Sequence, residues 1–439
     1  MRKTVLALAI LLSLTASAQN KWSLKQCLEY ALANNVDVKL TRLAKKTAIE
    51  ERKQANAQFL PSLSASTRHN LDYEPWIDAG MENEGSNIKK TAYNANYGID
   101  ASWTVWNGNI NRNQLRRNKL AEEVAELDIE ETCNSLQEEV AKLYIQILYT
   151  YEAIAVNEQS LEASKKNEER GREMLEVGRM SKAQLAQLTA QRAKDEYNVV
   201  EAKTNLAKYK MKLKQLLKLT GDNTFDIVQS TAPDQQALAD IPALKNVFDQ
   251  AMLLRPEIKS AEKNVKQKEL QIKIARGGYL PQVSLKGSLG TSTFSDSEYN
   301  WGLQMKRNVD LVAGVAISIP IFDNRLNKTA VNKAKIAHET ALLLQEDEKD
   351  ELYNTLEGYW LDAQNNQQKF RAAVQTVESE QESYDLLSEQ FNLGLKNVVD
   401  LMVGKASLLK AQQNKLQSKY LTILAIQLMK FYQGEALNI

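Results

Sequence analysis

The sequence contains one long internal repeat. Three landmarks recur in the same order, and the pairs are Pro61 with Pro281, Trp106 with Phe322, and Gly178 with Gly394. The first pair is separated by 220 residues and the other two by 216, so the four-residue difference lies between the first landmark and the second. Each copy spans 72 positions from its aromatic landmark to its glycine. A repeat of this length indicates two copies of one large structural unit rather than a solenoid of many small ones.

The first 18 residues are predicted to be a secretory signal peptide. Arg2 and Lys3 supply the positive start, residues 5–14 the short apolar stretch, and residues 16–18 the small residues of a cleavage site. The apolar stretch is too short to span a bilayer as a helix. The first cysteine after it is Cys27, so an N-terminal lipid anchor is not expected.

Composition excludes several classes of function. Removing the two basic residues of the signal changes the formal charge from +1 to about −1, and this near-neutral balance gives no electrostatic footprint for nucleic acid. Mean hydropathy is −0.45, and no later segment holds 18 apolar residues in a row, so no membrane-spanning helix is expected. Cys27 and Cys133 are the only cysteines, and two packed free thiols are favoured over a disulfide.

No catalytic or cofactor-binding pattern is present in the sequence. His69 and His338 are the only histidines, and neither lies near a cysteine or a paired acid, so a metal site is not expected. Gly404-Lys405 resembles part of a phosphate-binding loop but lacks the upstream glycine and the preceding strand. We therefore expect a protein that is not an enzyme and that needs no cofactor.

Four segments alternate between apolar and polar residues with a period of two. They cover residues 62–73, 93–106, 282–294 and 309–321. Each is long enough for a tilted membrane strand, which needs about 9–11 residues. A water-soluble sheet packed on a core is the alternative. Glycine, serine, asparagine and charge on the even positions suit a water-filled lumen, and aromatic residues flank the segments as at membrane interfaces, so membrane strands are favoured.

Most of the remaining sequence is predicted to be helical. Residues 109–176 and 324–392 contain no proline, and a helix of that length would be about 100 Å long and would need partners along its length. Residues 199–216 keep the 3,4 spacing of a coiled-coil seam. Shorter helices are expected over residues 22–58, 181–218, 244–276 and 398–432, with a break or bend at Arg255-Pro256. Residues 220–243 are expected to form a linker with one short strand, and residues 74–92 and 295–308 to form solvent loops.

Taken together, these segments resemble the TolC-like outer-membrane efflux protein family, also called outer membrane factors. The resemblance rests on residues 22–35, on the Leu-Pro pairs that close residues 56–61 and 276–281, and on the strand ends at 103–108 and 317–323. It implies a mainly helical chain with membrane strands, in which each repeat supplies two strands and long coiled-coil helices. It further implies a homotrimer that forms a 12-stranded outer-membrane β-barrel and a helical tunnel in the periplasm.

The repeat and the resemblance together divide the chain into four parts. The signal peptide covers residues 1–18, the first repeat residues 19–219, the linker or equatorial segment residues 220–243, and the second repeat residues 244–439. We expect a helical hairpin in each repeat, with tips at residues 177–181 and 393–397.

The resemblance assigns function to both hairpin tips. The residues expected to dock a periplasmic adaptor are Val177, Gly178, Arg179, Met180, Ser181, Leu393, Gly394 and Leu395. Lys396 and Asp400 are expected to form the gate, in which three copies of the acid make a ring that favours cations. Val403 stands where some members of the family carry a second inward acid, so a double ring is not expected. Simpler alternatives are a C-cap glycine at each tip and a first-turn acid at position 400.

The resemblance implies an outer-membrane duct of a tripartite efflux system for small toxic compounds. The implied partners are two further copies of the chain, a periplasmic adaptor (a membrane fusion protein), an inner-membrane pump and outer-membrane lipid, without nucleic acid. A duct for type I protein secretion remains an alternative of the same class. A soluble periplasmic coiled-coil adaptor is an alternative of a different class, although two hairpins, each joined to a strand pair, favour the duct.

Overall fold

The computed structural model describes residues 21–76, 90–219, 221 and 225–438. The predicted signal peptide lies outside these residues. Within the described ranges, no helix combines the length and the apolar character needed to cross a membrane.

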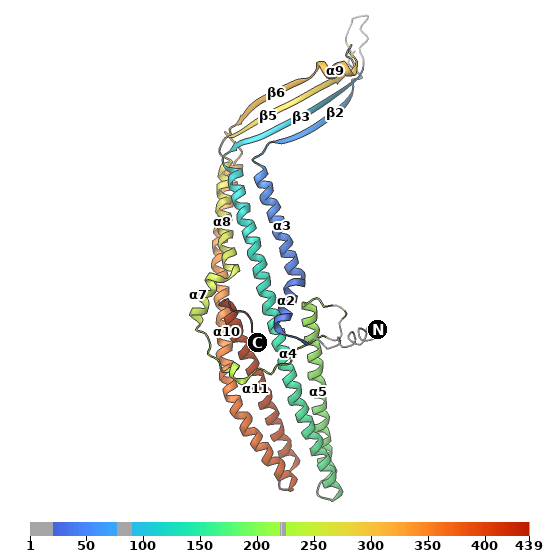
Figure 1. Cartoon of the computed structure of the whole chain (residues 1–439), viewed down its shortest axis with the longest axis vertical. Helices are drawn as coiled ribbons and strands as arrows, with labels where there is room; N and C mark the ends of the chain where they lie inside the picture. Colours follow the sequence, from blue (N-terminus) through green and yellow to red (C-terminus); the bar gives the residue numbers. More distant parts are fainter. Residues whose placement is uncertain (1–20, 77–89, 220, 222–224, 439) are drawn as a thin grey trace, which may run out of the picture. The chain divides into compact units, whose positions relative to one another are not determined.

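The two sequence repeats fold into the same series of elements (Figure 1). The first copy consists of α2 (Leu24–Asn34), α3 (Val36–Ala57), β2 (Ser62–Tyr73), β3 (Thr91–Asn107), α4 (Ile110–Glu176) and α5 (Lys182–Leu216). The second consists of α7 (Leu244–Leu254), α8 (Pro256–Gly277), β5 (Gln282–Phe294), β6 (Asp310–Ser318), α10 (Leu326–Asn392) and α11 (Val398–Tyr432). Four short elements stand outside the series: β1 (Lys21–Trp22), β4 (Asp226–Ile227), α6 (Asp234–Ala237) and α9 (Trp301–Arg307).

Corresponding helices have equal lengths in the two copies. α4 and α10 each contain 67 residues, and α5 and α11 each contain 35. Long antiparallel helices pack through side chains at fixed spacing, so neighbouring hairpins of unequal length could not keep their contacts in register. The equal spacing of the two sequence repeats therefore corresponds to two helical hairpins of equal length.

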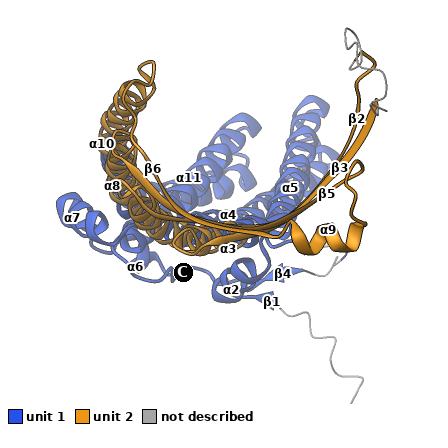
Figure 2. Cartoon of the chain, turned by 90° about the horizontal axis from the view of Figure 1, so that it is seen from above, with its two compact units in different colours: residues 1–42, 127–259, 347–439 blue, residues 43–126, 260–346 orange. Residues whose placement is uncertain are grey.

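The chain divides into two compact units, and each contains parts of both repeats (Figure 2). Unit 1 comprises residues 1–42, 127–259 and 347–439, and unit 2 comprises residues 43–126 and 260–346.

Unit 2 is built around a four-stranded antiparallel sheet in the order β2-β3-β5-β6. Ile99, Leu289 and Leu311 are paired across three neighbouring strands, and all three side chains are exposed on one face. Asp100 and Ser288 are likewise paired and point to the opposite face, because successive residues of a strand alternate. One face of this sheet is thus apolar and the other polar.

Unit 1 is a helical bundle with α11 at its centre. Seventeen residues of α11 are buried, against four of α5. The main apolar cluster includes Phe370, Tyr420 and Leu213, from three different helices. The short parallel pair of β1 and β4 and the buried Ile227 join the linker segment to this same cluster.

The structure corrects three details of the predicted elements. The helix expected over residues 22–58 is interrupted at Asn35, whose Oδ1 accepts a hydrogen bond of 2.7 Å from the backbone N–H of Asp37 and so caps α3. β6 ends at Ser318, three residues early, because Pro320 has no N–H to continue the ladder. The connector 295–308 is not a simple solvent loop, since it contains α9. The break at Arg255 before Pro256 is confirmed.

Candidate functional site: the hairpin tips and the contact between the hairpins

The first hairpin turns at a glycine in the left-handed region. Gly178 has a φ of +72°, and its N–H donates to the carbonyl of Leu175 at 3.0 Å. The N–H of Arg179 donates to the carbonyl of Met174 at 2.8 Å. These two bonds form a Schellman motif, which satisfies the last free carbonyls of α4.

The second hairpin turns by the same geometry. Gly394 has a φ of +77°, its N–H donates to Phe391 at 2.9 Å, and the N–H of Leu395 donates to Gln390 at 2.8 Å. A Cβ added at either glycine would meet nothing within 4 Å. Both tips are therefore open to solvent in this chain, and glycine is required there only by the backbone conformation.

The returning helices begin with different caps. At the first tip, Ser181 and Gln184 form a reciprocal capping box, with bonds of 3.2 Å and 3.0 Å between each side chain and the other residue's N–H. At the second tip, the Oδ1 of Asn397 accepts from the N–H of Asp400 at 2.9 Å. Asp400 thus occupies the same position in its helix as Gln184 does in α5. The second tip therefore carries a carboxylate where the first tip carries a neutral amide.

The gate residues predicted from the sequence lie together at the second tip. The Nζ of Lys396 and the Oδ2 of Asp400 are 3.8 Å apart, and the two side chains are 44% and 40% exposed. The pair is local to one tip, so within one chain it does not join the two hairpins.

Both tips line one groove with a volume of about 460 Å³. Beneath it lies an apolar cluster drawn from both hairpins, consisting of Met174, Met180, Leu188, Phe391, Val398 and Leu401. Val177, Leu393 and Leu395 lie outside this cluster, and their side chains are exposed. Of the residues predicted to dock an adaptor, Met180 alone is buried, so its side chain supports the tip from beneath.

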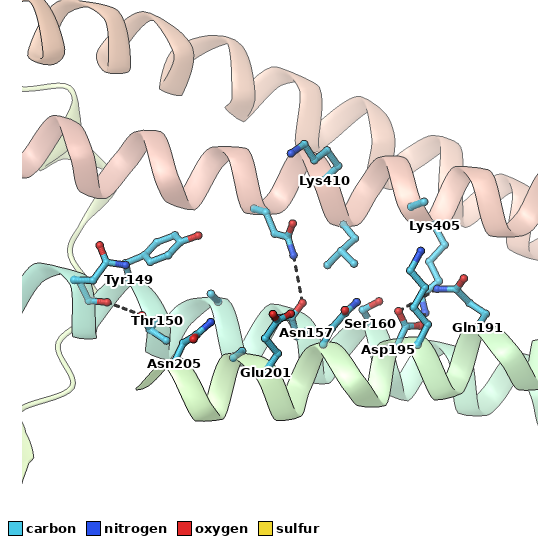
Figure 3. A pocket seen from close by; sticks show the side chains of 18 of the residues that line it. Tyr149, Thr150, Asn157, Ser160, Gln191, Asp195, Glu201, Asn205, Lys405 and Lys410 are labelled. Carbon is cyan, nitrogen blue, oxygen red and sulfur yellow. Dashed lines mark hydrogen bonds and ion pairs between the residues drawn. The ribbon is translucent and has the colours of Figure 1, made fainter. Parts of the chain in front are cut away.

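A buried ionic cluster joins the two hairpins further from the tips (Figure 3). The Nζ of Lys405 on α11 donates to both the Oδ2 of Asp195 on α5 and the Oγ of Ser164 on α4. The Ser164 hydroxyl also donates to the same carboxylate at 2.5 Å, and Gln191 donates to its other oxygen at 3.0 Å. The Lys405 and Asp195 side chains are only 5% and 1% exposed. Burial lowers the pKa of Lys405, and its bonds to Asp195 oppose that shift.

A second carboxylate holds α4 against α5. Glu168 accepts from Arg172 at 2.8 Å and from Thr189 at 3.0 Å, and its other oxygen lies 2.7 Å from Arg192. The hydrogen bond from Arg172 lowers the pKa of Glu168. This group fixes the first hairpin internally, whereas Lys405 reaches across from the second hairpin. Lys419, also on α11 and buried, makes a further such contact, with its Nζ 3.6 Å from the Oε2 of Glu152 on α4.

The contact made by Lys405 was not predicted from the sequence. In the sequence, Gly404-Lys405 resembles only a fragment of a phosphate-binding loop, which does not indicate this contact. The sequence does contain a pattern that could have indicated this contact. Leu401, Lys405 and Leu408 follow the spacing of an apolar helical face, and a lysine on such a face needs a buried partner. Within the described residues, no cluster of three or more potential metal ligands is present, and Cys27 and Cys133 are free thiols.

Comparison with known proteins places the chain in a family. The sequence model described as "Outer membrane efflux protein" matches residues 27–219 and 247–430, which covers most of both repeats. The chain belongs to the outer membrane efflux protein family. This efflux protein is therefore an outer-membrane protein with a periplasmic extension, and its family is one of channel proteins rather than enzymes.

Named relatives agree in sequence and in structure. The chain is 23% identical to toxin and drug export protein A of Aggregatibacter actinomycetemcomitans over 411 residues, covering 92% of this chain and 84% of the relative. It is 22% identical to the probable efflux pump outer membrane protein TtgC of Pseudomonas putida over 422 residues, covering 91% and 81%.

Among solved structures, CusC matches with a TM-score of 0.80 at 18% identity, covering 92% of this chain and 91% of that one. The outer membrane protein VceC of Vibrio cholerae matches with a TM-score of 0.79 at 16% identity, covering 94% and 97%. These likenesses confirm the predicted fold of duplicated strand pairs and long helices.

Proposed function

We propose that this chain is the outer-membrane duct of a tripartite efflux system, exporting small toxic compounds that an inner-membrane pump delivers. The observation that carries the proposal is the architecture of the chain. Four strands with one apolar and one polar face, together with two hairpins of matched length, suit a pore that continues beyond the membrane.

Three copies of the chain complete this pore. The sheet has β2 and β6 as its edges, and an unpaired edge in lipid would leave backbone groups without partners at a cost of several kcal/mol each. Closing the edges of three copies gives twelve strands, which is wider than the eight-stranded barrels that side chains fill. The polar faces of the three sheets would line the lumen.

The hairpin tips are the docking surface for a periplasmic adaptor. Val177, Leu393 and Leu395 present exposed apolar side chains beside the two glycines, with Arg179 and Ser181 at the first turn. A buried Met180 fixes the turn from beneath. Exposed apolar groups next to glycines allow another helical tip to approach the backbone closely.

Lys396 and Asp400 form the gate in this proposal. Three copies of Asp400 around the axis of a trimer would make one acidic ring. Because the ion pair between Lys396 and Asp400 is exposed, either side chain can leave it and contact a neighbouring chain instead. Val403 is exposed one turn further along, so the ring is single.

The substrate class follows from the relatives. Their printed names refer to toxins and drugs, antibiotics and toluene, which favours small toxic compounds for this chain as well. A duct for type I protein secretion remains the second candidate, and the name "toxin and drug export protein" supports it.

Substitution at the tips tests the docking surface. Gly178→Trp and Gly394→Trp, each made in a host whose own copy of the chain is deleted, are expected to abolish efflux of a fluorescent drug while the purified protein remains trimeric. Gly358→Trp is the matched control, because that glycine lies within α10, has an ordinary helical φ and has open space around it. Normal efflux in both tip variants would refute the docking role.

A further inference from the structure

The helix α9 lies on the apolar face of the sheet in unit 2. Its first residue, Trp301, makes an edge contact with the ring of Tyr97 at 6.5 Å between centroids. Tyr97 belongs to the same face of β3 as Ile99, because residues two apart in a strand share a face. Figure 2 shows α9 on the convex side of the curved sheet, beside β3 and β5.

The connector is fixed in this place by side chains that complete the strand's hydrogen bonds. Gln304 is buried, accepts from the N–H of Phe294 at 2.8 Å and donates to its carbonyl at 3.1 Å. The Oγ1 of Thr291 donates to the carbonyl of Met305 at 3.0 Å, and Asn308 donates to Ser292 at 2.6 Å. These bonds hold the helix along the last residues of β5, at the end of the sheet remote from Pro281.

The outward surface of α9 combines exposed apolar groups with positive charge. The side chains of Trp301 and Leu303 are exposed, and Lys306 and Arg307 are exposed in the last turn. The guanidinium of Arg307 lies 4.2 Å above the ring of Tyr299, which is also exposed. The helix dipole explains a basic residue at this end, but it does not explain exposed indole and leucine side chains beside it.

This surface continues the apolar face of the sheet. Leu71, Leu289 and Leu311, on three strands of that face, are all exposed in the chain. A short helix that adds aromatic, apolar and basic side chains at the end of an apolar band has the composition of a segment lying in a membrane interface.

We propose that α9 lies in the outward-facing leaflet of the outer membrane, where Lys306 and Arg307 bind the phosphate of anionic lipid headgroups. The proposal deepens the proposed function and rests on it, because the apolar face of the sheet must first be in lipid. Trp301 and Leu303 enter the boundary between headgroups and acyl chains, and the stacked guanidinium is held ready for a phosphate. The partner is the lipid surface and not free phosphate.

Depth measurements test the position of α9. A fluorophore is attached at Leu303→Cys in a Cys27→Ala/Cys133→Ala background, and the protein is placed in phosphatidylcholine vesicles that carry a nitroxide on the headgroup or in the middle of the acyl chain. We expect the headgroup nitroxide to quench position 303 more strongly. A label at Leu289→Cys should be quenched more strongly by the acyl-chain nitroxide, and one at Lys286→Cys, on the polar face, only weakly by either.

The outcomes separate the two proposals. Quenching at position 289 without quenching at position 303 would overturn the placement of α9 and leave the duct intact. Equal or absent quenching at positions 289 and 286 would show that the sheet does not lie in lipid, and both proposals would fail.

Lipid retention tests the two basic residues. The protein is extracted from vesicles holding about 20 mol% phosphatidic acid in phosphatidylcholine, and the retained lipid is counted by native mass spectrometry. Each basic side chain near an anionic surface is worth about a five-fold preference, so Lys306→Gln/Arg307→Gln should lose most of the enrichment in phosphatidic acid. Lys286→Gln is the matched control. Equal enrichment in phosphatidic acid in the wild type and the double variant would overturn headgroup binding.

Discussion

Two lysine–aspartate pairs of unit 1 use the same chemistry in opposite surroundings. Lys405 and Asp195 are almost completely buried and join the second hairpin to the first, while Lys396 and Asp400 are about two-fifths exposed and lie within one turn. An exposed pair contributes little to stability because water screens it, whereas a buried pair is costly to break because one charge would remain without a partner. We infer from this difference in burial that Lys405 and Asp195 hold the two hairpins together, whereas Lys396 and Asp400 can exchange their partners.

The same contrast appears in the burial of the hairpins. α11 buries seventeen residues and α5 four, although the two helices have the same length and the same place in their repeats. In unit 1, the second hairpin therefore supplies the central helix. In the proposed trimer, the surface of α5 that is left uncovered would contact neighbouring chains.

The largest expected effect comes from removing one partner of the buried pair. Asp195→Ala leaves the Lys405 cation buried without its carboxylate, and breaking such a pair costs about 3–5 kcal/mol. Thermal unfolding of the purified protein, followed by circular dichroism, should show a clearly lower midpoint. The variant Asp195→Leu/Lys405→Met removes both charges and should unfold close to the wild type. If Asp195→Ala unfolded at the wild-type temperature, the pair would not hold the hairpins.

The pH dependence of stability should reveal the same lysine. Burial lowers the pKa of Lys405 from its usual 10.5, so the folded state binds fewer protons than the unfolded state between the lowered value and 10.5. Stability should therefore increase as pH rises through that window. Tyrosines also titrate in this window, so the quantity to measure is the free energy of unfolding of the wild type minus that of Asp195→Leu/Lys405→Met. This difference should increase as pH rises. A difference that stays constant with pH would contradict the lowered pKa.

The smallest expected effect belongs to the exposed pair. Lys396→Gln removes an exposed ion pair between the hairpin turn and the first turn of α11, and exposed pairs contribute about 0.2–1 kcal/mol. The unfolding midpoint should hardly change, and Lys182→Gln at the start of α5 provides a control for loss of one exposed cation. A large drop in the unfolding midpoint would instead mean that, in the purified protein, Lys396 makes contacts between the chains of a trimer and that these contacts hold the tip closed.

Much of the fold could be predicted because the repeat fixes element lengths. The long proline-free segments gave the two 67-residue helices, and period-two alternation located the strands to within about three residues. The sequence did not reveal α9, because a seven-residue helix has too few turns to show periodicity and depends on the bonds of Gln304 to the sheet. The break at Asn35 was missed for a similar reason, since a side-chain cap of one residue leaves no pattern in its neighbours.

The candidate site was predictable in part. The tip glycines were found because Gly178 and Gly394 recur at the same place in the two repeats, and the structure shows that each has the positive φ of a helix C-cap, which favours glycine. The burial of Met180 could not be predicted, because it depends on packing against Phe391 and Val398 from the other hairpin. The ionic cluster of Lys405, Asp195 and Ser164 was missed because its members lie more than 200 residues apart or on different helices, and only the fold brings them together.

The most direct test of the duct is the conductance of the detergent-purified protein in a planar bilayer. We predict a small conductance that prefers cations in the wild type, and a larger or less selective one in Asp400→Ala. Gln184→Ala, at the equivalent position of the first tip, should behave as the wild type. If Asp400→Ala changed neither conductance nor selectivity, Asp400 would not be part of the gate. The absence of any pore would contradict the duct itself.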